Sequence, residues 1–232
     1  MLAGMDTFML VHSPSVGPAT WNPVAEVLRA RGHAAVVPSL VDVTAGPAPY
    51  WPRVVDAVTA AAPPDGPLVI VAHSNAGRFV PLIAEALRGR ISACLFVDAA
   101  LPPRRGPVPG EPPEPAAFLR DLADDAGILP RWTDWWPDEV VADLFPDEAT
   151  RRVVVAEQPR LPLDYYLLDI PVPSRWDHVR GAYLWFDSPY AETAKEASER
   201  GWPVERIPGG HLHQLTDPES VASWLIRSAT GG

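Results

Sequence analysis

Short apolar runs bounded by turn residues recur along the chain and predict the strands of a buried sheet. The runs stay apolar throughout instead of alternating with polar residues, which is typical of parallel strands covered on both faces. Turn residues on either side mark where each run begins and ends. The predicted strands are 8–11, 34–37, 68–72, 93–97, 182–186 and a weaker run over 204–207.

Segments with the apolar spacing of helices lie between these runs. Several are followed by a glycine, the residue that most often ends a helix: Gly32, Gly89 and Gly201. Strands and helices that alternate in this way specify a doubly wound, mostly parallel sheet of about six strands with helices on both faces. The predicted fold class is therefore α/β. The predicted helices are 21–31, 50–62, 76–88, 192–200 and 218–228.

The alternation breaks after the strand that ends near Asp98, where an insertion over 101–175 opens with a proline-rich loop, 102–115. Short helices are predicted beyond it, and a linker would not contain the aromatic density of this region. We interpret 1–232 as one domain with 101–175 as a helical cap over the carboxyl edge of the sheet. Whether the rings line a pocket or only pack the cap down stays open. The cap helices are 116–124, 138–144, 147–157 and 163–168, and the aromatic residues are Trp132, Trp135, Trp136, Tyr165 and Tyr166.

Composition narrows the classes of partner. The length of 232 residues suits one large domain, and a net charge of -10 disfavours nucleic acid, which binds through Lys and Arg. No apolar run approaches the ~20 residues of a membrane span, the first six residues lack the features of a secretion signal, and the single Cys forms no disulfide framework. We expect a cytoplasmic monomer or homodimer that acts on a small molecule without a cofactor.

The segment from Ala72 to Ala76 predicts a nucleophilic serine. Ala-His-Ser-Asn-Ala is a small-x-Ser-x-small sequence placed between a strand and a helix, and Ser74 is its centre. The sharp turn that lifts such a serine above a sheet needs small flanking residues. The backbone N–H of Asn75 opens the following helix and is a predicted oxyanion donor. The alternative is a serine in an ordinary turn, but the rest of the chain favours the nucleophile.

A serine needs a base to take its proton, and His211 lies after the last strand and before the last helix, where that base is expected. His213 lies two residues later, so a His-x-His metal site is an alternative. No third His or Cys ligand is near them in the sequence, and we predict no metal. His73, inside the turn beside the serine, is predicted to form the pocket wall.

The loop after the first strand carries a resemblance to a known family. His12, Gly17 and Trp21 match in spacing the His-Gly-x-x-x-Gly-x-x-x-Trp loop of the plant methyl-esterase and hydroxynitrile-lyase branch of the α/β-hydrolases. The positions of Ser74 and His211 and the strand order match as well. The resemblance covers nearly the whole chain apart from the cap, and it implies an α/β-hydrolase fold.

The same resemblance implies a modified oxyanion hole. Family members use a backbone N–H two residues after the motif His as the second donor, and here that position is Pro14, which has none. Losing one donor costs ~10²-fold or more in acyl transfer. The hydroxyl of Ser13 or Ser15 is a substitute. Family lyases also carry a hydroxyl residue where this chain has Ser13, which leaves lyase chemistry open.

Two acids end strands at the correct edge of the sheet, Asp98 and Asp187. Asp187 follows the strand that supplies the acid more often in this fold, although Ser-Pro comes directly after it. Asp98 lies among apolar neighbours, and a carboxylate there needs a partner. We favour Asp98 as the acid that holds His211 and keep Asp187 as the alternative.

Three functions are compatible with these residues. The leading hypothesis is a cofactor-free hydrolase of an ester, thioester or lactone that forms an acyl-Ser74 intermediate. The second is a lyase in which His211 is the base and Ser74 relays a proton, and the third is a binding module that has lost turnover. The expected lining, Trp132 and Trp136 with the residues named above, favours a small and largely apolar substrate.

Overall fold

A six-stranded parallel sheet forms the centre of the computed structural model, which describes residues 6–230. The strand order is β2-β1-β3-β4-β5-β6, and each neighbouring pair is parallel. The α/β class and the six predicted strands are confirmed. The start of the chain, where we expected no secretion signal, lies for its first five residues outside the described part. The strands are β1 (Thr7–Val11), β2 (Ala34–Val36), β3 (Leu68–Ser74), β4 (Ile91–Ala99), β5 (Arg180–Trp185) and β6 (Val204–Arg206).

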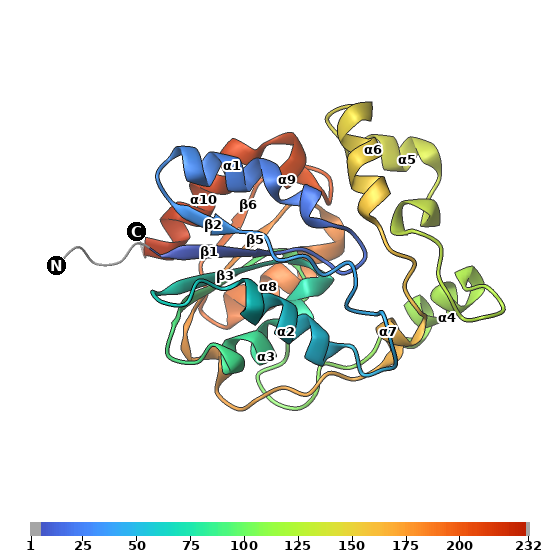
Figure 1. Ribbon diagram of the computed structural model, residues 1–232, viewed down its shortest axis with the longest axis horizontal. Coiled ribbons are helices and arrows are strands. Elements are labelled where there is room, and N and C mark those ends of the chain that lie inside the picture. Colours follow the sequence, from blue (N-terminus) through green and yellow to red (C-terminus); the bar gives the residue numbers. More distant parts are fainter. Residues whose placement is uncertain (1–5, 231–232) are drawn as a thin grey trace.

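Helices cover both faces of this sheet (Figure 1). One face packs against α1 and α10, and the other packs against α2, α3 and α8. Within β1, Phe8 and Leu10 point to the first face, whereas Met9 and Val11 point to the second, because successive side chains of a strand alternate. Short helices precede α1, α3 and α8 and follow β6. The helices are α1 (Asn22–Ala30), α2 (Trp51–Ala61), α3 (Val80–Ala86), α8 (Ala191–Glu199), α9 (His213–Thr216) and α10 (Pro218–Thr230), with the 3-10 helices η1 (Pro18–Thr20), η2 (Asn75–Phe79) and η5 (Ser188–Tyr190).

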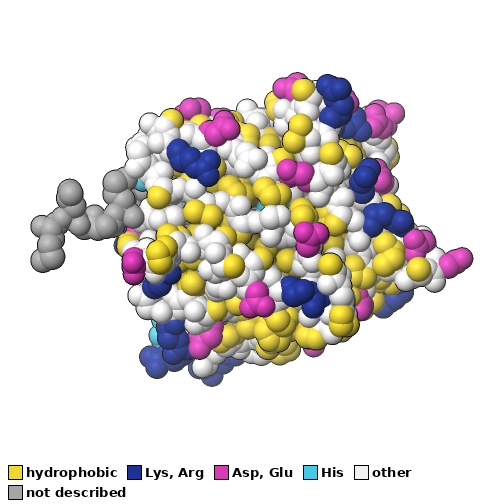
Figure 2. Space-filling view, in the orientation of Figure 1, with side chains coloured by type: hydrophobic (Ala, Val, Ile, Leu, Met, Phe, Trp, Pro, Cys, Tyr) yellow, Lys and Arg dark blue, Asp and Glu magenta, His cyan; other side chains and the backbone are white. Residues whose placement is uncertain are grey.

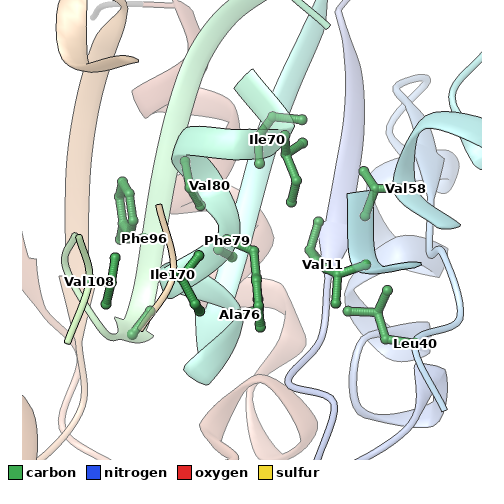
Figure 3. Close-up of a cluster of buried hydrophobic side chains, with 14 of the residues drawn as sticks. Val11, Leu40, Val58, Ile70, Ala76, Phe79, Val80, Phe96, Val108 and Ile170 are labelled. Carbon is green, nitrogen blue, oxygen red and sulfur yellow. The ribbon is translucent and has the colours of Figure 1, made fainter. Parts of the chain in front are cut away.

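The larger of the two cores lies between the sheet and α2 and α3 (Figure 3). Val11, Ile70 and Phe96 extend from three neighbouring strands into this core and are fully buried. Burial on both faces explains why the strands are apolar throughout. Cys94 in β4 belongs to the same core, and burial raises the pKa of its thiol to about 12.

The insertion between β4 and β5 contributes a second, helical layer beside the carboxyl edge of the sheet (Figure 1). Its two ends join the core, where Val108 and Ile170 pair as an antiparallel bridge. Helices lie in all four predicted positions, although α7 is only one turn long. The interpretation of this insertion as a cap within one domain stays a prediction. Its elements are α4 (Pro113–Leu122), η3 (Trp132–Trp135), α5 (Asp138–Ala142), α6 (Glu148–Glu157), α7 (Asp164–Leu167) and η4 (Trp176–His178).

The surface differs between the two layers. Every large hydrophobic side chain that is strongly exposed among residues 6–230 belongs to the insertion: Phe118, Trp136, Val140, Val153 and Leu168. On the face shown in Figure 2, basic and acidic side chains are interspersed. None of the described helices is both long and apolar enough to cross a membrane.

The register of the parallel strands brings their carboxyl ends to one edge. Val11 of β1 lies opposite Ala72 of β3, and Ser74 lies opposite Ala99 of β4 after a register shift at His73. The loop that follows Val11, the turn at Ser74 and the end of β4 therefore meet. These are the segments that carry the candidate residues.

Candidate active site

Ser74 occupies a strained turn between β3 and η2. Its backbone φ of 57° and ψ of -131° lie in a region that residues other than glycine rarely adopt. The turn is tight because Ala100 N–H donates to the Ser74 carbonyl at 3.0 Å. A Cβ on Gly77 would lie 1.9 Å from the Ala100 carbonyl oxygen, so this position requires glycine. The predicted helix 76–88 consequently begins as the 3-10 helix η2 and continues as α3.

A chain of hydrogen bonds connects Ser74, His211 and Asp98. His211 Nε2 lies 2.9 Å from Ser74 Oγ, and His211 Nδ1 lies 2.6 Å from Asp98 Oδ2. The proton on Nδ1 is donated to the carboxylate, which leaves Nε2 free to accept the serine proton. Ser74 and His211 are half-buried, so both remain accessible from solvent. This arrangement can activate a hydroxyl as a nucleophile.

Asp98 is held firmly at the end of β4. Its side chain is buried, with 1% of the residue exposed, and its Oδ1 accepts a hydrogen bond from Phe186 N–H at 2.9 Å. The φ of 44° at Asp98 is a second strained backbone position. The Tyr183 hydroxyl donates to the Ala99 carbonyl and accepts from Ala99 N–H, which fixes this turn. Both oxygens of the Asp98 carboxylate therefore have partners, as a buried carboxylate requires.

The second candidate acid, Asp187, lies elsewhere. It is exposed and begins η5, where its carbonyl oxygen accepts from Tyr190 N–H at 3.2 Å. Among the described residues, the carboxylate bonded to the His211 ring is that of Asp98. The geometry thus favours Asp98, which the sequence also favoured because of its apolar neighbours.

Two further histidines are buried beside the site. His73 Nε2 donates to the His211 carbonyl at 2.8 Å, and the two rings lie 4.6 Å apart. Burial, followed by the charge of His211, holds the pKa of His73 well below its usual value. His12 bonds Ser13 and Leu40 through its two ring nitrogens, and burial lowers its pKa to about 4. His73 was expected to form the pocket wall, but with 1% exposure it supports the His211 loop instead.

His213 has a local role in α9. Its Nδ1 lies 2.8 Å from Thr216 Oγ1, and its ring packs edge-on against Phe186. Within 6–230 no group of three or more His, Cys, Asp or Glu side chains is placed to hold a metal ion.

The loop facing Ser74 is a compact network of hydroxyl groups. Ser13, Pro14 and Ser15 are buried. Ser15 N–H donates to Ser13 Oγ at 3.3 Å, Ser13 Oγ donates to Ser15 Oγ at 3.2 Å, and Ser15 Oγ lies 2.5 Å from the Tyr166 hydroxyl. On the opposite side of the turn, the neighbouring Tyr165 donates to Asn75 Oδ1 at 2.6 Å. Two successive tyrosines of α7 thus contact both loops beside Ser74.

Comparison with known sequences settles the family. Residues 8–224 match the sequence profile described as the alpha/beta hydrolase family. This chain belongs to that family. The matched range includes the strained serine, His211, Asp98 and the whole insertion.

Individual relatives agree with this assignment. Esterase PIR7B of Oryza sativa subsp. japonica is 38% identical over 104 residues, which span 41% of this chain and 39% of the rice esterase. The match therefore covers well under half of that relative's length. It confirms the resemblance to the plant branch that the His12 loop predicted.

Solved structures share the fold. An extracellular alpha/beta-hydrolase from a Paenibacillus species has a TM-score of 0.72 at 18% identity, covering 96% of this chain and 98% of that one. A pyrethroid hydrolase from Sphingobium faniae has a TM-score of 0.73 at 20% identity, covering 97% of this chain and 98% of that one. These similarities confirm the α/β-hydrolase fold.

Of the two tryptophans predicted to bind substrate in this α/β-hydrolase, Trp132 lies near His211. The half-buried Trp132 ring is 5.9 Å from the His211 ring. Trp136 stacks on Phe118 at 5.5 Å and is 44% exposed, and its contact with substrate stays a prediction. The two residues lie at opposite ends of η3, and the direction of a one-turn helix cannot be derived from the apolar pattern.

Tyr190 is a site residue that the sequence analysis missed. Its ring stacks on the His211 ring, with centroids 5.3 Å apart and planes inclined by 7°. Burial raises the pKa of Tyr190, while a hydrogen bond with Ser74 opposes that increase. The available signal was its position three residues after Asp187, at the carboxyl edge where the family carries catalytic groups.

Proposed function

We propose that this α/β-hydrolase is a cofactor-free serine hydrolase that acts on an ester, thioester or lactone of a small, largely apolar metabolite. The hydrogen-bonded chain from Ser74 through His211 to Asp98, with distances of 2.9 Å and 2.6 Å, carries the proposal. A serine, a histidine and a buried carboxylate bonded in this order can activate the serine for acyl transfer.

The reaction proceeds in two steps. His211 Nε2 takes the proton of Ser74 as Oγ attacks the substrate carbonyl, and the protonated ring then gives that proton to the leaving group. Asp98 holds the ring in the required tautomer and stabilises its positive charge. A water molecule, deprotonated by the same nitrogen, attacks the acyl-Ser74 ester; as the acid leaves, His211 returns that proton to Ser74 Oγ.

The surroundings of His211 support an apolar substrate. Trp132 and Tyr190 both lie against its ring, and both are half-buried. Aromatic side chains beside an accessible nucleophile favour an acyl group or ring that can pack against them. The esterase named among the relatives supports ester chemistry over the matched 104 residues.

Labelling with a fluorophosphonate tests this function. The reagent should modify the wild-type protein at Ser74, as located by mass spectrometry of its peptides, and should leave Ser74→Ala unlabelled. Activated esters should give a burst of alcohol or phenol release followed by turnover. Absence of both labelling and burst would rule out the acyl-enzyme.

The second candidate is a lyase that uses His211 as base without an acyl-enzyme. Pro14, which has no backbone N–H, and the hydroxyl of Ser13 favour it. Reaction in ¹⁸O-labelled water separates the two candidates, because hydrolysis places the label in the released acid and a lyase reaction does not.

A further inference from the structure

The facing loop lacks one expected donor. Val11 and Ala72 are register partners in β1 and β3, so Ser13 and Ser74 each lie two residues beyond the same pair. The loop that begins at Ser13 therefore faces the nucleophile, and Pro14 within it cannot donate from its backbone. A hydrolase with this loop needs its second oxyanion donor from another group.

Three hydroxyl groups form a directional chain beside that gap. Ser15 N–H donates to Ser13 Oγ, Ser13 Oγ donates to Ser15 Oγ, and Ser15 Oγ contacts the Tyr166 hydroxyl. Each hydroxyl that accepts a hydrogen bond becomes a better donor to the next group in the chain. The favoured direction therefore runs from the backbone N–H to the tyrosine.

One of the three hydroxyl groups has an O–H that its neighbours in this series do not use. Three hydroxyls supply three O–H groups, and the two contacts between their oxygens use two of them. With Ser15 donating, the unused proton belongs to Tyr166. The exposed fractions of Ser13, Ser15 and Tyr166 are 3%, 6% and 5%, so water has little access to any of the three hydroxyls.

Tyr166 lies beside groups that contact the reaction centre. Its neighbour Tyr165 bonds the side chain of Asn75, the residue after the nucleophile. The rings of Tyr165 and Tyr166 pack edge-on, with centroids 4.8 Å apart, so both lie beside the turn at Ser74. Burial is the main cause that raises the pKa of Tyr166, which keeps its proton in place at neutral pH.

We propose that the Tyr166 hydroxyl, polarised through Ser15 and Ser13, is the second oxyanion donor and replaces the backbone N–H that Pro14 lacks. Asn75 N–H is the first donor. The inference rests on the proposed serine hydrolase function. It makes α7 of the insertion part of the catalytic machinery.

The test compares Tyr166→Phe with the matched variant Tyr50→Phe. Tyr50 is also buried, and its hydroxyl also bonds α7, donating to Asp164 Oδ1 at 2.6 Å. Tyr166→Phe should slow fluorophosphonate labelling of Ser74 and lower kcat by about 10²-fold, with KM nearly unchanged. Tyr50→Phe should react at close to the wild-type rate. Equal rates for Tyr166→Phe and wild type, or equal losses in both variants, would overturn the inference.

Pro14→Ala provides the decisive second test, because it restores a backbone N–H at the position that lacks one. In that background Tyr166→Phe should slow labelling much less than it does in the wild-type sequence. Equal slowing in both backgrounds would show that the hydroxyl does not replace that N–H. Ser15→Ala removes the group that polarises Tyr166 but leaves the Tyr166 hydroxyl in place, so it should slow labelling less than Tyr166→Phe does.

The wild-type protein separates this inference from the function on which it rests. If the wild type is not labelled at Ser74, the proposed function fails and the inference fails with it. If the wild type is labelled and Tyr166→Phe is labelled equally fast, the hydrolase remains and only the role of Tyr166 is refuted.

Discussion

The sheet and the insertion above it are held in place by different means. The strands place their large side chains in two continuous apolar cores, where Phe8, Ile70 and Phe96 are 1% exposed or less. The insertion leaves several large hydrophobic side chains exposed, and besides its two ends it packs through a smaller apolar cluster in which Val141 and Val154 meet Leu212. Apolar packing is therefore continuous across the sheet, whereas the insertion meets it in separate patches.

Polar side chains also connect the insertion to the sheet. Arg78, buried in η2 four residues after Ser74, donates to the carbonyl oxygens of Pro109 and Leu168 at 3.0 and 3.1 Å. Glu157 at the end of α6 accepts from Ala19 N–H at 2.8 Å. The turn that carries the nucleophile is thus bonded to both chain segments that connect the insertion. The two regions can be perturbed separately.

The largest effect is expected at the sheet edge, from Asp98→Asn. Loss of the carboxylate that orients His211 should lower kcat by about 10⁴-fold, as in other triads. Asp187→Asn is the matched control, since Asp187 is exposed and lies two residues beyond the neighbouring strand β5. Steady-state kinetics of both variants decide between the acids. A large loss in Asp187→Asn and a small one in Asp98→Asn would reverse our assignment.

Gly77→Ala tests how tightly the turn is packed. The added Cβ would collide with the Ala100 carbonyl, so we expect a loss of about 3 kcal/mol in the free energy of unfolding and greatly reduced labelling of Ser74. Gly89→Ala is the control, because Gly89 has a φ of +83° but open space around it. It should cost about 1 kcal/mol, from backbone conformation alone. Urea unfolding measures both, and equal losses would contradict a role for close packing.

Low pH should decrease the free energy of unfolding through the buried histidines beside the sheet. The pKa of His12 is about 4 in the folded protein and 6.5 in the unfolded chain, so the unfolded state binds more protons between these pH values. The free energy of unfolding should be at its full value above pH 6.5 and fall as the pH drops toward 4, by on the order of 3 kcal/mol from this residue. His73 acts in the same direction. Urea titrations across this pH range should show that the free energy of unfolding depends less steeply on pH in His12→Gln than in the wild type. An unchanged dependence would refute the role of His12.

Arg78→Met is expected to loosen the insertion more than the sheet. Methionine keeps most of the side-chain length but loses both hydrogen bonds to the carbonyl oxygens, at a cost of about 2 kcal/mol. Hydrogen exchange should quicken across α4 to α7, while the amides of β3 and β4 remain protected. Uniform acceleration throughout the protein would mean that the insertion and the sheet unfold as one unit.

The sequence predicted the sheet well because its strands are buried on both faces, which makes the apolar runs unambiguous. The positions of Ser74, His211 and Asp98 followed from their places at strand ends. The insertion was harder. Its helices span a few turns at most, so the apolar pattern could not reveal which way Trp136 points.

The contacts of Tyr166 and Tyr190 could not be predicted for a related reason. Each reaches the site only after a segment outside the strand and helix pattern has folded back over the sheet, and no local spacing encodes that return. The split of the predicted helix 76–88 also depended on tertiary structure. At Gly77, where Ala100 approaches closely, the chain has the tighter 3-10 geometry of η2.

Cys94 makes the insertion experimentally accessible. It is the chain's sole cysteine, and a buried thiol with a pKa near 12 does not form the thiolate that maleimides and related reagents attack. A cysteine introduced at Val153, which is 55% exposed on α6, would therefore carry a fluorophore or spin label with no native residue removed first. Distance changes between that label and a second one on the sheet would report insertion movement during turnover.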